Sequence, residues 1–149
     1  MVGLKDTLKV KSRTRKVGVA VTAVASAAGM VFAATPAAAA GSADFSVVYT
    51  ASYYKGTATW SNRSVGVIGS FKASNCRRVY VRAFAGSTSL DFQSSSTWCN
   101  RSGPANFTLD ANVVGGSDSI WVYMTTEDPD NVLAAQTCYR SGYCVDGRV

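Results

Sequence analysis

The chain has 149 residues, a formal net charge of +6 and no histidine. The absence of histidine excludes Ser-His-Asp and Cys-His catalysis and histidine-ligated metal sites, because each of them needs an imidazole. The length fits one domain with a modest core.

The first forty residues have the three-part pattern of a secretory signal peptide. Residues 1–16 carry six basic side chains and one acid, residues 17–34 carry no charge, and TPAAAA offers small residues for cleavage. A membrane anchor is the alternative, but the apolar run is rich in Ala, Gly and Thr, and no basic stop-transfer cluster follows Pro36. We predict cleavage after Ala40, with Ala43 as the second choice, which leaves residues 41–149 as a secreted domain without a membrane partner.

Cleavage removes most of the positive charge. Residues 41–149 hold nine Lys and Arg against eight Asp and Glu, whereas a nucleic-acid binder needs a basic patch that neutralises phosphates. The most basic stretch, RRVYVRAF at residues 77–84, alternates apolar and polar side chains as a half-buried strand does. We therefore expect no nucleic-acid partner.

The first half of this domain reads as short strands. DFSVVYTASYY is predicted to be one strand that places Phe45, Val47, Tyr49, Ala51 and Tyr53 on one face. Lys55-Gly56 should turn into TATW, and RSVGVIGSFKA gives the next strand, in which glycines suggest a bulge or a close backbone approach. Residues 77–85 and 90–98 should pair as a hairpin around the turn at 86–89.

The second half continues the pattern to the end of the chain. NRSGPA at 100–105 reads as a loop, and NFTLDANV after it alternates cleanly. A turn at 114–118, the strand SIWVYMTT, the loop EDPDN and a last segment from Val132 complete the series. Short strands without a capped helix predict an all-β fold, an antiparallel immunoglobulin-like sandwich of about seven strands that we expect to be monomeric.

Four cysteines, all after the leader, indicate two disulfides in an oxidising compartment. The spacing allows three pairings, and the centre of the 86–89 turn lies midway between Cys76 and Cys99, which favours their pairing across the open end of the hairpin. Cys138 and Cys144 would then clip the loop YRSGY. Zinc is disfavoured, because there is no C-x-x-C motif and no histidine.

Aromatic side chains provide one set of candidate binding residues. Exposed rings can stack on the faces of sugars, and we select Tyr53, Tyr54, Tyr139 and Tyr143 for this role. Trp60 and Trp121 lie within predicted strands and are expected to be core residues.

Two loops provide further candidates. The clipped loop CYRSGYC could present Arg140 to the specificity pocket of a trypsin-like protease, since a preorganised loop binds at lower entropic cost. The acidic loop holds Glu127, Asp128 and Asp130, whose oxygens could bind calcium, although Pro129 and Asn131 also fit a solvated turn. Apart from this calcium alternative, no cofactor is expected.

No pair of carboxylates stands out as the acid and base that glycoside hydrolysis needs. Glu127 is the single glutamate of the chain, and a hydrolase that uses it is the catalytic alternative. We predict a non-catalytic protein.

The leader ending in TPAAAA, the segment GTATWSNRSVGVIGSFKASNCRRVYVRAFAG and the later VVGGSDSIWV resemble small secreted β-sandwich proteins of actinobacteria. The resemblance covers most of residues 41–149 and implies export from a bacterium and a sandwich fold, without an activity. The sequence thus predicts a secreted domain that binds an extracellular ligand, such as a cell-wall or extracellular polymer. A protease inhibitor acting through residues 138–144 and a carboxylate hydrolase are the alternatives.

Overall fold

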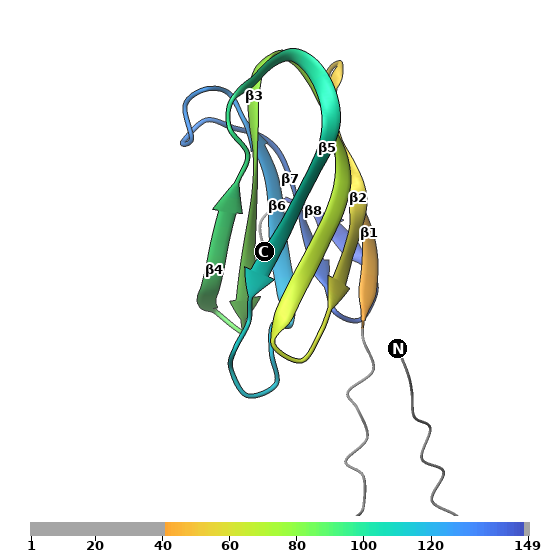
Figure 1. Cartoon of the computed structure of the whole chain (residues 1–149), viewed down its shortest axis with the longest axis vertical. Coiled ribbons are helices and arrows are strands. Elements are labelled where there is room, and N and C mark those ends of the chain that lie inside the picture. Colours follow the sequence, from red (N-terminus) through yellow and green to blue (C-terminus); the bar gives the residue numbers. More distant parts are fainter. Residues whose placement is uncertain (1–40, 148–149) are drawn as a thin grey trace, which may run out of the picture. The chain divides into compact units, whose positions relative to one another are not determined.

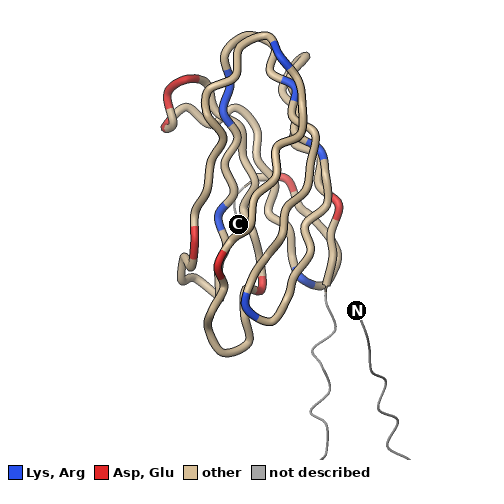
Figure 2. The backbone as a smooth tube through the Cα atoms, viewed as in Figure 1, with Lys and Arg blue, Asp and Glu red and all other residues tan. Residues whose placement is uncertain are grey.

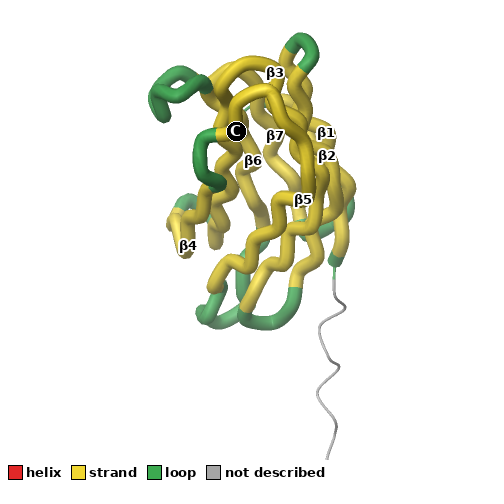
Figure 3. The backbone as a smooth tube through the Cα atoms, turned by 45° about the horizontal axis from the view of Figure 1, so that its top comes forward, coloured by secondary structure: helices red, strands yellow, loops and turns green. Residues whose placement is uncertain are grey.

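A computed structural model describes residues 41–147. The predicted leader, residues 1–40, lies outside them, whereas Gly41 and Ala43, at the two predicted cleavage positions, are described. Every element is an antiparallel β-strand, and Figures 1 and 3 show no helix in this part of the chain. No helix of residues 41–147 could therefore cross a membrane. The strands are β1 (Ser42–Tyr49), β2 (Ser52–Trp60), β3 (Ser64–Ala85), β4 (Thr88–Ser94), β5 (Trp98–Asp110), β6 (Ser119–Thr125), β7 (Val132–Tyr139) and β8 (Cys144–Asp146).

The long strand β3 organises the sheet. Its first half, as far as Arg77, pairs with β2 and β5, and its second half, from Arg78, pairs with β6 and β4. The strand order is β1-β2-β3-β6-β7-β8, with β4 and β5 added along β3. The expected all-β fold is confirmed, but the pairing joins the strands into one sheet, and a separate immunoglobulin-like pair of sheets is not confirmed.

The sheet curls so that β1 comes into contact with β7. β1 lies against β7, where the Ser46 backbone N–H donates to Gln136 Oε1 at 2.7 Å, so residues 41–147 form a nearly closed barrel (Figure 1). Buried and exposed side chains alternate clearly along β1, as the period of a strand requires, whereas nearly every position of β6 is buried. The largest fully buried side chains are Trp60, Tyr54, Phe71, Leu109, Ile120 and Met124.

Two of the predicted boundaries are wrong. The chain turns at Thr50, whose φ is 50°, so residues 44–54 form parts of two strands, and Lys55-Gly56 lies inside β2 instead of in a turn. The turn reverses which residues face inward, and it buries Tyr54 in place of Tyr53. An added Cβ at Gly69 would come within 2.6 Å of the Tyr54 ring and 2.8 Å of the Lys55 carbonyl oxygen, so the expected close approach is confirmed there. At Gly66, the other glycine for which it was expected, nothing lies within 4 Å.

The predicted loop 100–105 is also wrong, because these residues belong to β5. Pro104 is exposed there and pairs with Ser70, on a strand whose ladder runs along β3 alone. Proline lacks an N–H and is tolerated on such an edge strand. Pro104, which suggested a loop in the sequence, therefore marks an edge strand of the sheet.

Both predicted disulfides are confirmed, Cys76–Cys99 and Cys138–Cys144. A hairpin of β3 and β4 is also confirmed, with its turn at Gly86, whose φ of 57° suits glycine. Its second arm is shorter than predicted, since β4 ends at Ser94 and Trp98 belongs to β5. However, Cys99 lies in β5, where it is the register partner of Cys76. This bridge therefore joins β3 to β5 and does not close the β3–β4 hairpin.

Candidate binding pocket

The outer face of the second half of the sheet is covered by aromatic rings. Inward positions of β3 are odd-numbered, so Tyr80 and Phe84 point outward, and the register places them next to outward residues of β4 and β6. Phe92, Tyr80, Tyr123 and Trp121 form a stacked series with successive centroid separations of 5.6, 4.9 and 3.9 Å. The face is therefore a continuous aromatic ladder across three strands.

Arginine side chains cover parts of this ladder. The guanidinium of Arg78 lies 5.2 Å from the centroid of Tyr80, and that of Arg82 lies 4.7 Å from the centroid of Phe92. Arg78 also donates to the carbonyl of Ser95 and to the hydroxyl of Ser94. The predicted alternation is confirmed for Arg78 and Arg82, which lie on the outer face over aromatic rings. The strand is not half-buried as predicted, because Tyr80 between them is 3% exposed and this face is covered as well.

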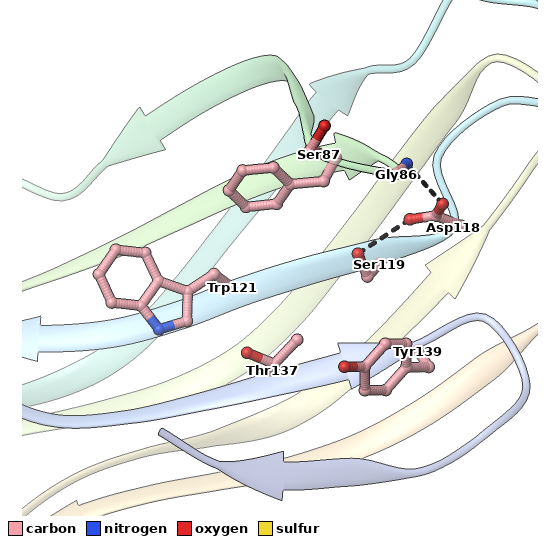
Figure 4. Close-up of a pocket in the computed structure, with 8 residues that line it drawn as sticks. Gly86, Ser87, Asp118, Ser119, Trp121, Thr137 and Tyr139 are labelled. Carbon is pink, nitrogen blue, oxygen red and sulfur yellow. Dashed lines mark hydrogen bonds between the residues drawn. The ribbon is translucent and has the colours of Figure 1, made fainter. Parts of the chain in front are cut away.

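A pocket of about 490 Å³ opens at the turn end of the same face (Figure 4). The β3–β4 turn, β6 and β7 all contribute to it. The lining residues are Phe84, Gly86, Ser87, Asp118, Ser119, Trp121, Thr137 and Tyr139. Three aromatic rings, hydroxyl groups and one carboxylate thus meet in a volume typical of small-ligand sites.

Asp118 is fixed at both its backbone and its side chain. One carboxylate oxygen accepts the Gly86 backbone N–H at 2.6 Å, and the other accepts the Ser119 hydroxyl at 2.9 Å (Figure 4). Its backbone N–H donates to the carbonyl of Phe84, and its own carbonyl accepts the N–H of Arg140. A carboxylate offers about four acceptor positions, so Asp118 keeps acceptor capacity for a ligand while its position is set.

The disulfide Cys138–Cys144 shapes one wall of the pocket. Tyr139 lines the pocket, and Tyr143 stacks on it with a centroid separation of 4.8 Å. The bridge joins the residues next to these two rings, and the Tyr139 backbone N–H donates to the Tyr143 carbonyl at 2.9 Å. Tyr143 is 54% exposed, so the stacked pair extends an aromatic platform from the pocket toward solvent.

The predicted aromatic candidates separate into three groups. Tyr139 and Tyr143 lie together at the pocket, as a shared role requires, whereas Tyr53 lies on the other half of the sheet beside Lys55. Tyr54 is fully buried, its hydroxyl donates to the carbonyl of Ala105 at 2.8 Å, and burial raises the pKa of this phenol well above its ordinary value. Its selection as an exposed binding ring is wrong, because the turn at Thr50 reverses the alternation.

The two tryptophans that were expected in the core also differ. Trp60 is fully buried, as predicted, but Trp121 is partly exposed and lines the pocket. The alternation within SIWVYMTT could have predicted this position of Trp121. Ile120, Val122 and Met124 take the inward positions, so Trp121 between them lies on the outer face. Phe84 and Asp118 lack such a signal, because only pairing across strands brings them to the pocket.

Arg140 does not extend from the clipped loop. It is half-buried, and its guanidinium donates to the carbonyl of Gly115 at 2.8 Å. A side chain held in this way cannot enter a protease pocket without breaking that bond. The geometry therefore gives no support to the inhibitor hypothesis.

The acidic loop forms a hydrogen-bonded turn. The Asp130 backbone N–H donates to an Asp128 carboxylate oxygen at 3.0 Å, and the Asp128 N–H donates to the hydroxyl of Thr126. Figure 2 shows the acidic part of this loop in red, at the end of the sheet opposite the β3–β4 turn. Among residues 41–147, the one group of three potential metal ligands is Cys76, Cys99 and Glu127. Its two sulfurs are bonded to each other as a disulfide. Glu127, Asp128 and Asp130 do not form such a group in this part of the chain, and calcium binding stays a prediction.

Comparison of the chain with protein-family models, with curated proteins and with solved structures finds no match.

Proposed function

We propose that this protein is a secreted, non-catalytic domain that binds an extracellular polysaccharide through the pocket between β3, β6 and β7. The signal-peptide pattern and the two disulfides support export. Export from a bacterium, kinship with the actinobacterial β-sandwich proteins, an immunoglobulin-like strand arrangement and a monomeric state are parts of the same proposal.

The meeting of aromatic rings with polar groups in one pocket carries this proposal. Phe84, Trp121 and Tyr139 provide apolar surfaces on which a sugar ring can stack. Ser119, Thr137 and Asp118 provide oxygen atoms that can accept hydrogen bonds from sugar hydroxyls. A hydroxyl-rich ring with an apolar face matches this combination better than a purely apolar ligand does.

Binding is favoured over hydrolysis by the charges that line the pocket. A glycoside hydrolase needs two carboxyl groups that flank the scissile bond, and Asp118 is the one acidic residue among the eight that line this pocket. Glu127 lies at a different hollow, together with Asp128 and beside Arg77. The hydrolase hypothesis therefore lacks its second group where the ligand would bind.

The test is depletion of the protein from solution by purified cell walls and insoluble polysaccharides at low and high salt. The protein is expressed from the full 149-residue sequence and purified with both disulfides oxidised. We expect salt-resistant depletion that Trp121→Ala weakens by more than about tenfold, because loss of a central tryptophan removes most of the stacking area.

Ile68→Ala is the matched control, because Ile68 is 69% exposed on the outer face of the other half of the sheet. It should leave the depletion unchanged. Equal depletion by Trp121→Ala and the unmodified protein would move the binding surface away from this pocket, and no depletion by any polymer would contradict the proposal.

A further inference from the structure

The pocket carries a single charge. Asp118 is the one charged residue among those that line it. Two arginines neighbour lining residues, Arg82 as the register partner of Trp121 and Arg140 next to Tyr139 in the sequence. Neither lines the pocket, since Arg82 lies over Phe92 and Arg140 donates to the carbonyl of Gly115. A bound ligand therefore meets one negative carboxylate and the faces or edges of three aromatic rings.

This combination favours an organic cation. The negative face of an aromatic ring attracts an ammonium group, and a carboxylate forms a charge-assisted hydrogen bond with its N–H donors. An acidic sugar would instead place a second negative charge next to Asp118. A neutral sugar would gain the stacking but not the charge-assisted bond.

The carboxylate is ready for this contact before any ligand arrives. Hydrogen bonds from the Gly86 N–H and the Ser119 hydroxyl fix its two oxygens, and the backbone of residue 118 is bound to β3 and to residue 140. A group that is held in place loses little entropy on binding. Asp118 is thus positioned to distinguish ligands by charge.

We propose that the pocket selects a polysaccharide unit that carries a free ammonium group over the same unit with an acylated nitrogen. This inference rests on the proposed function and names the ligand class of the same pocket. Hydroxyl-bearing side chains, Ser119 and Thr137, line the pocket together with the rings, which favours an amino sugar over the apolar stem of a lysine side chain.

The probes are soluble oligomers of glucosamine and the same oligomers in N-acetylated form, measured by calorimetry below the pKa of the sugar amine. The two oligomers share one backbone and differ in the charge on nitrogen. We expect the oxidised protein to bind the amino form at least about tenfold more tightly, as a charge-assisted hydrogen bond allows. Tetramethylammonium, whose charge is permanent, should compete with the amino form.

Asp118→Asn should reduce the affinity for the amino form to that for the N-acetylated form, because the amide keeps the shape and loses the charge. The matched control is Asp110→Asn, which removes an equal charge from an exposed position on β5. Thermal melting verifies that both variants are folded. The selectivity of the unmodified protein is measured without any variant, so it remains informative if Asp118→Asn does not fold.

The outcomes separate this inference from the proposed function. Equal affinity for the two oligomers, or a preference that Asp118→Asn leaves unchanged, would overturn the amino-sugar assignment and leave polysaccharide binding in place. If neither oligomer binds but Trp121-dependent depletion by a polymer is seen, the assignment again fails alone. If that depletion also fails, the proposed function fails with it.

Discussion

The two halves of β3 have the same inner face and different outer faces. In the first half the outward residues include Gly66, Ile68 and Lys72, which are small, isolated or charged, whereas in the second half Tyr80, Arg82 and Phe84 belong to the aromatic face. Burial of the inner face needs only the alternation of Val67, Phe71, Val79 and Val81 and their neighbours. That alternation does not by itself require rings on the outer face. Tyr80 and Tyr123 there are 3% and 6% exposed and pack beneath their neighbours, whereas Trp121 is partly exposed and lines the pocket of the proposed function.

Each half of the sheet also contains one disulfide, and removing the two disulfides separately should affect stability and binding differently. Cys76–Cys99 closes a sequence separation of 23 and Cys138–Cys144 a separation of 6. Because the entropy of the unfolded chain falls more when a longer loop is closed, replacing the first pair with serine should cost about 3 kcal/mol of unfolding free energy and replacing the second about 2 kcal/mol.

Ligand binding should follow the opposite order. The second bridge holds Tyr139 next to Tyr143 at the pocket, so its loss should weaken polymer depletion by more than about tenfold. Loss of the first bridge should leave depletion unchanged while the protein is folded. Stability is measured by denaturant unfolding and binding by depletion, on both double-serine variants. If the variant that loses more stability also loses more binding, the proposed functional difference between the two halves of the sheet is contradicted.

The inner face should respond equally in both halves. Val67 and Val81 are both fully buried, one in each half of β3. Val67→Ala and Val81→Ala should each reduce the unfolding free energy by about 2 kcal/mol, since each loses buried methyl groups and leaves a cavity. Urea denaturation measures this quantity. A much smaller loss in the second half would mean that the aromatic face, and not the inner face, stabilises it.

Tyr54 and Tyr53 compare the inner and outer faces of β2. Tyr54→Phe should cost about 1 kcal/mol of unfolding free energy at neutral pH, because it removes the hydrogen bond to the carbonyl of Ala105. Tyr53→Phe, at a partly exposed position, is the control and should change stability little.

Tyr54 should also make the unfolding free energy fall as the pH rises above about 10. Burial raises the pKa of the Tyr54 phenol in the folded protein, so above the unfolded value of about 10 the unfolded chain loses this proton while the folded chain keeps it. Tyr54 therefore contributes to a loss of stability as the pH rises above about 10. Tyr54→Phe should reduce that loss in urea titrations at alkaline pH, and an unchanged profile would contradict the buried phenol.

The sequence by itself determined the local features of this protein. Alternation predicted strands at residues 63–73, 77–85 and 119–126, and all of these residues except Arg63 and Thr126 are strand, although the first two segments are one continuous strand, β3. Glycine marked the turns at 86 and 115–116, and the spacing of cysteines favoured the pairing that is found. These features could be predicted because they depend on neighbouring residues, through side-chain direction, backbone freedom and loop length.

Only the tertiary structure decided the features that depend on pairing between strands. A single turn at Thr50 exchanged the buried and exposed positions of Tyr54 and Tyr53, since a shift of one residue moves every side chain of a strand to the other face. The pocket combines Phe84, Asp118 and Tyr139, which are far apart in the sequence and meet because β6 lies between the second half of β3 and β7. Alternation predicts that a side chain lies on a face, but the strand order and register decide which other side chains share that face.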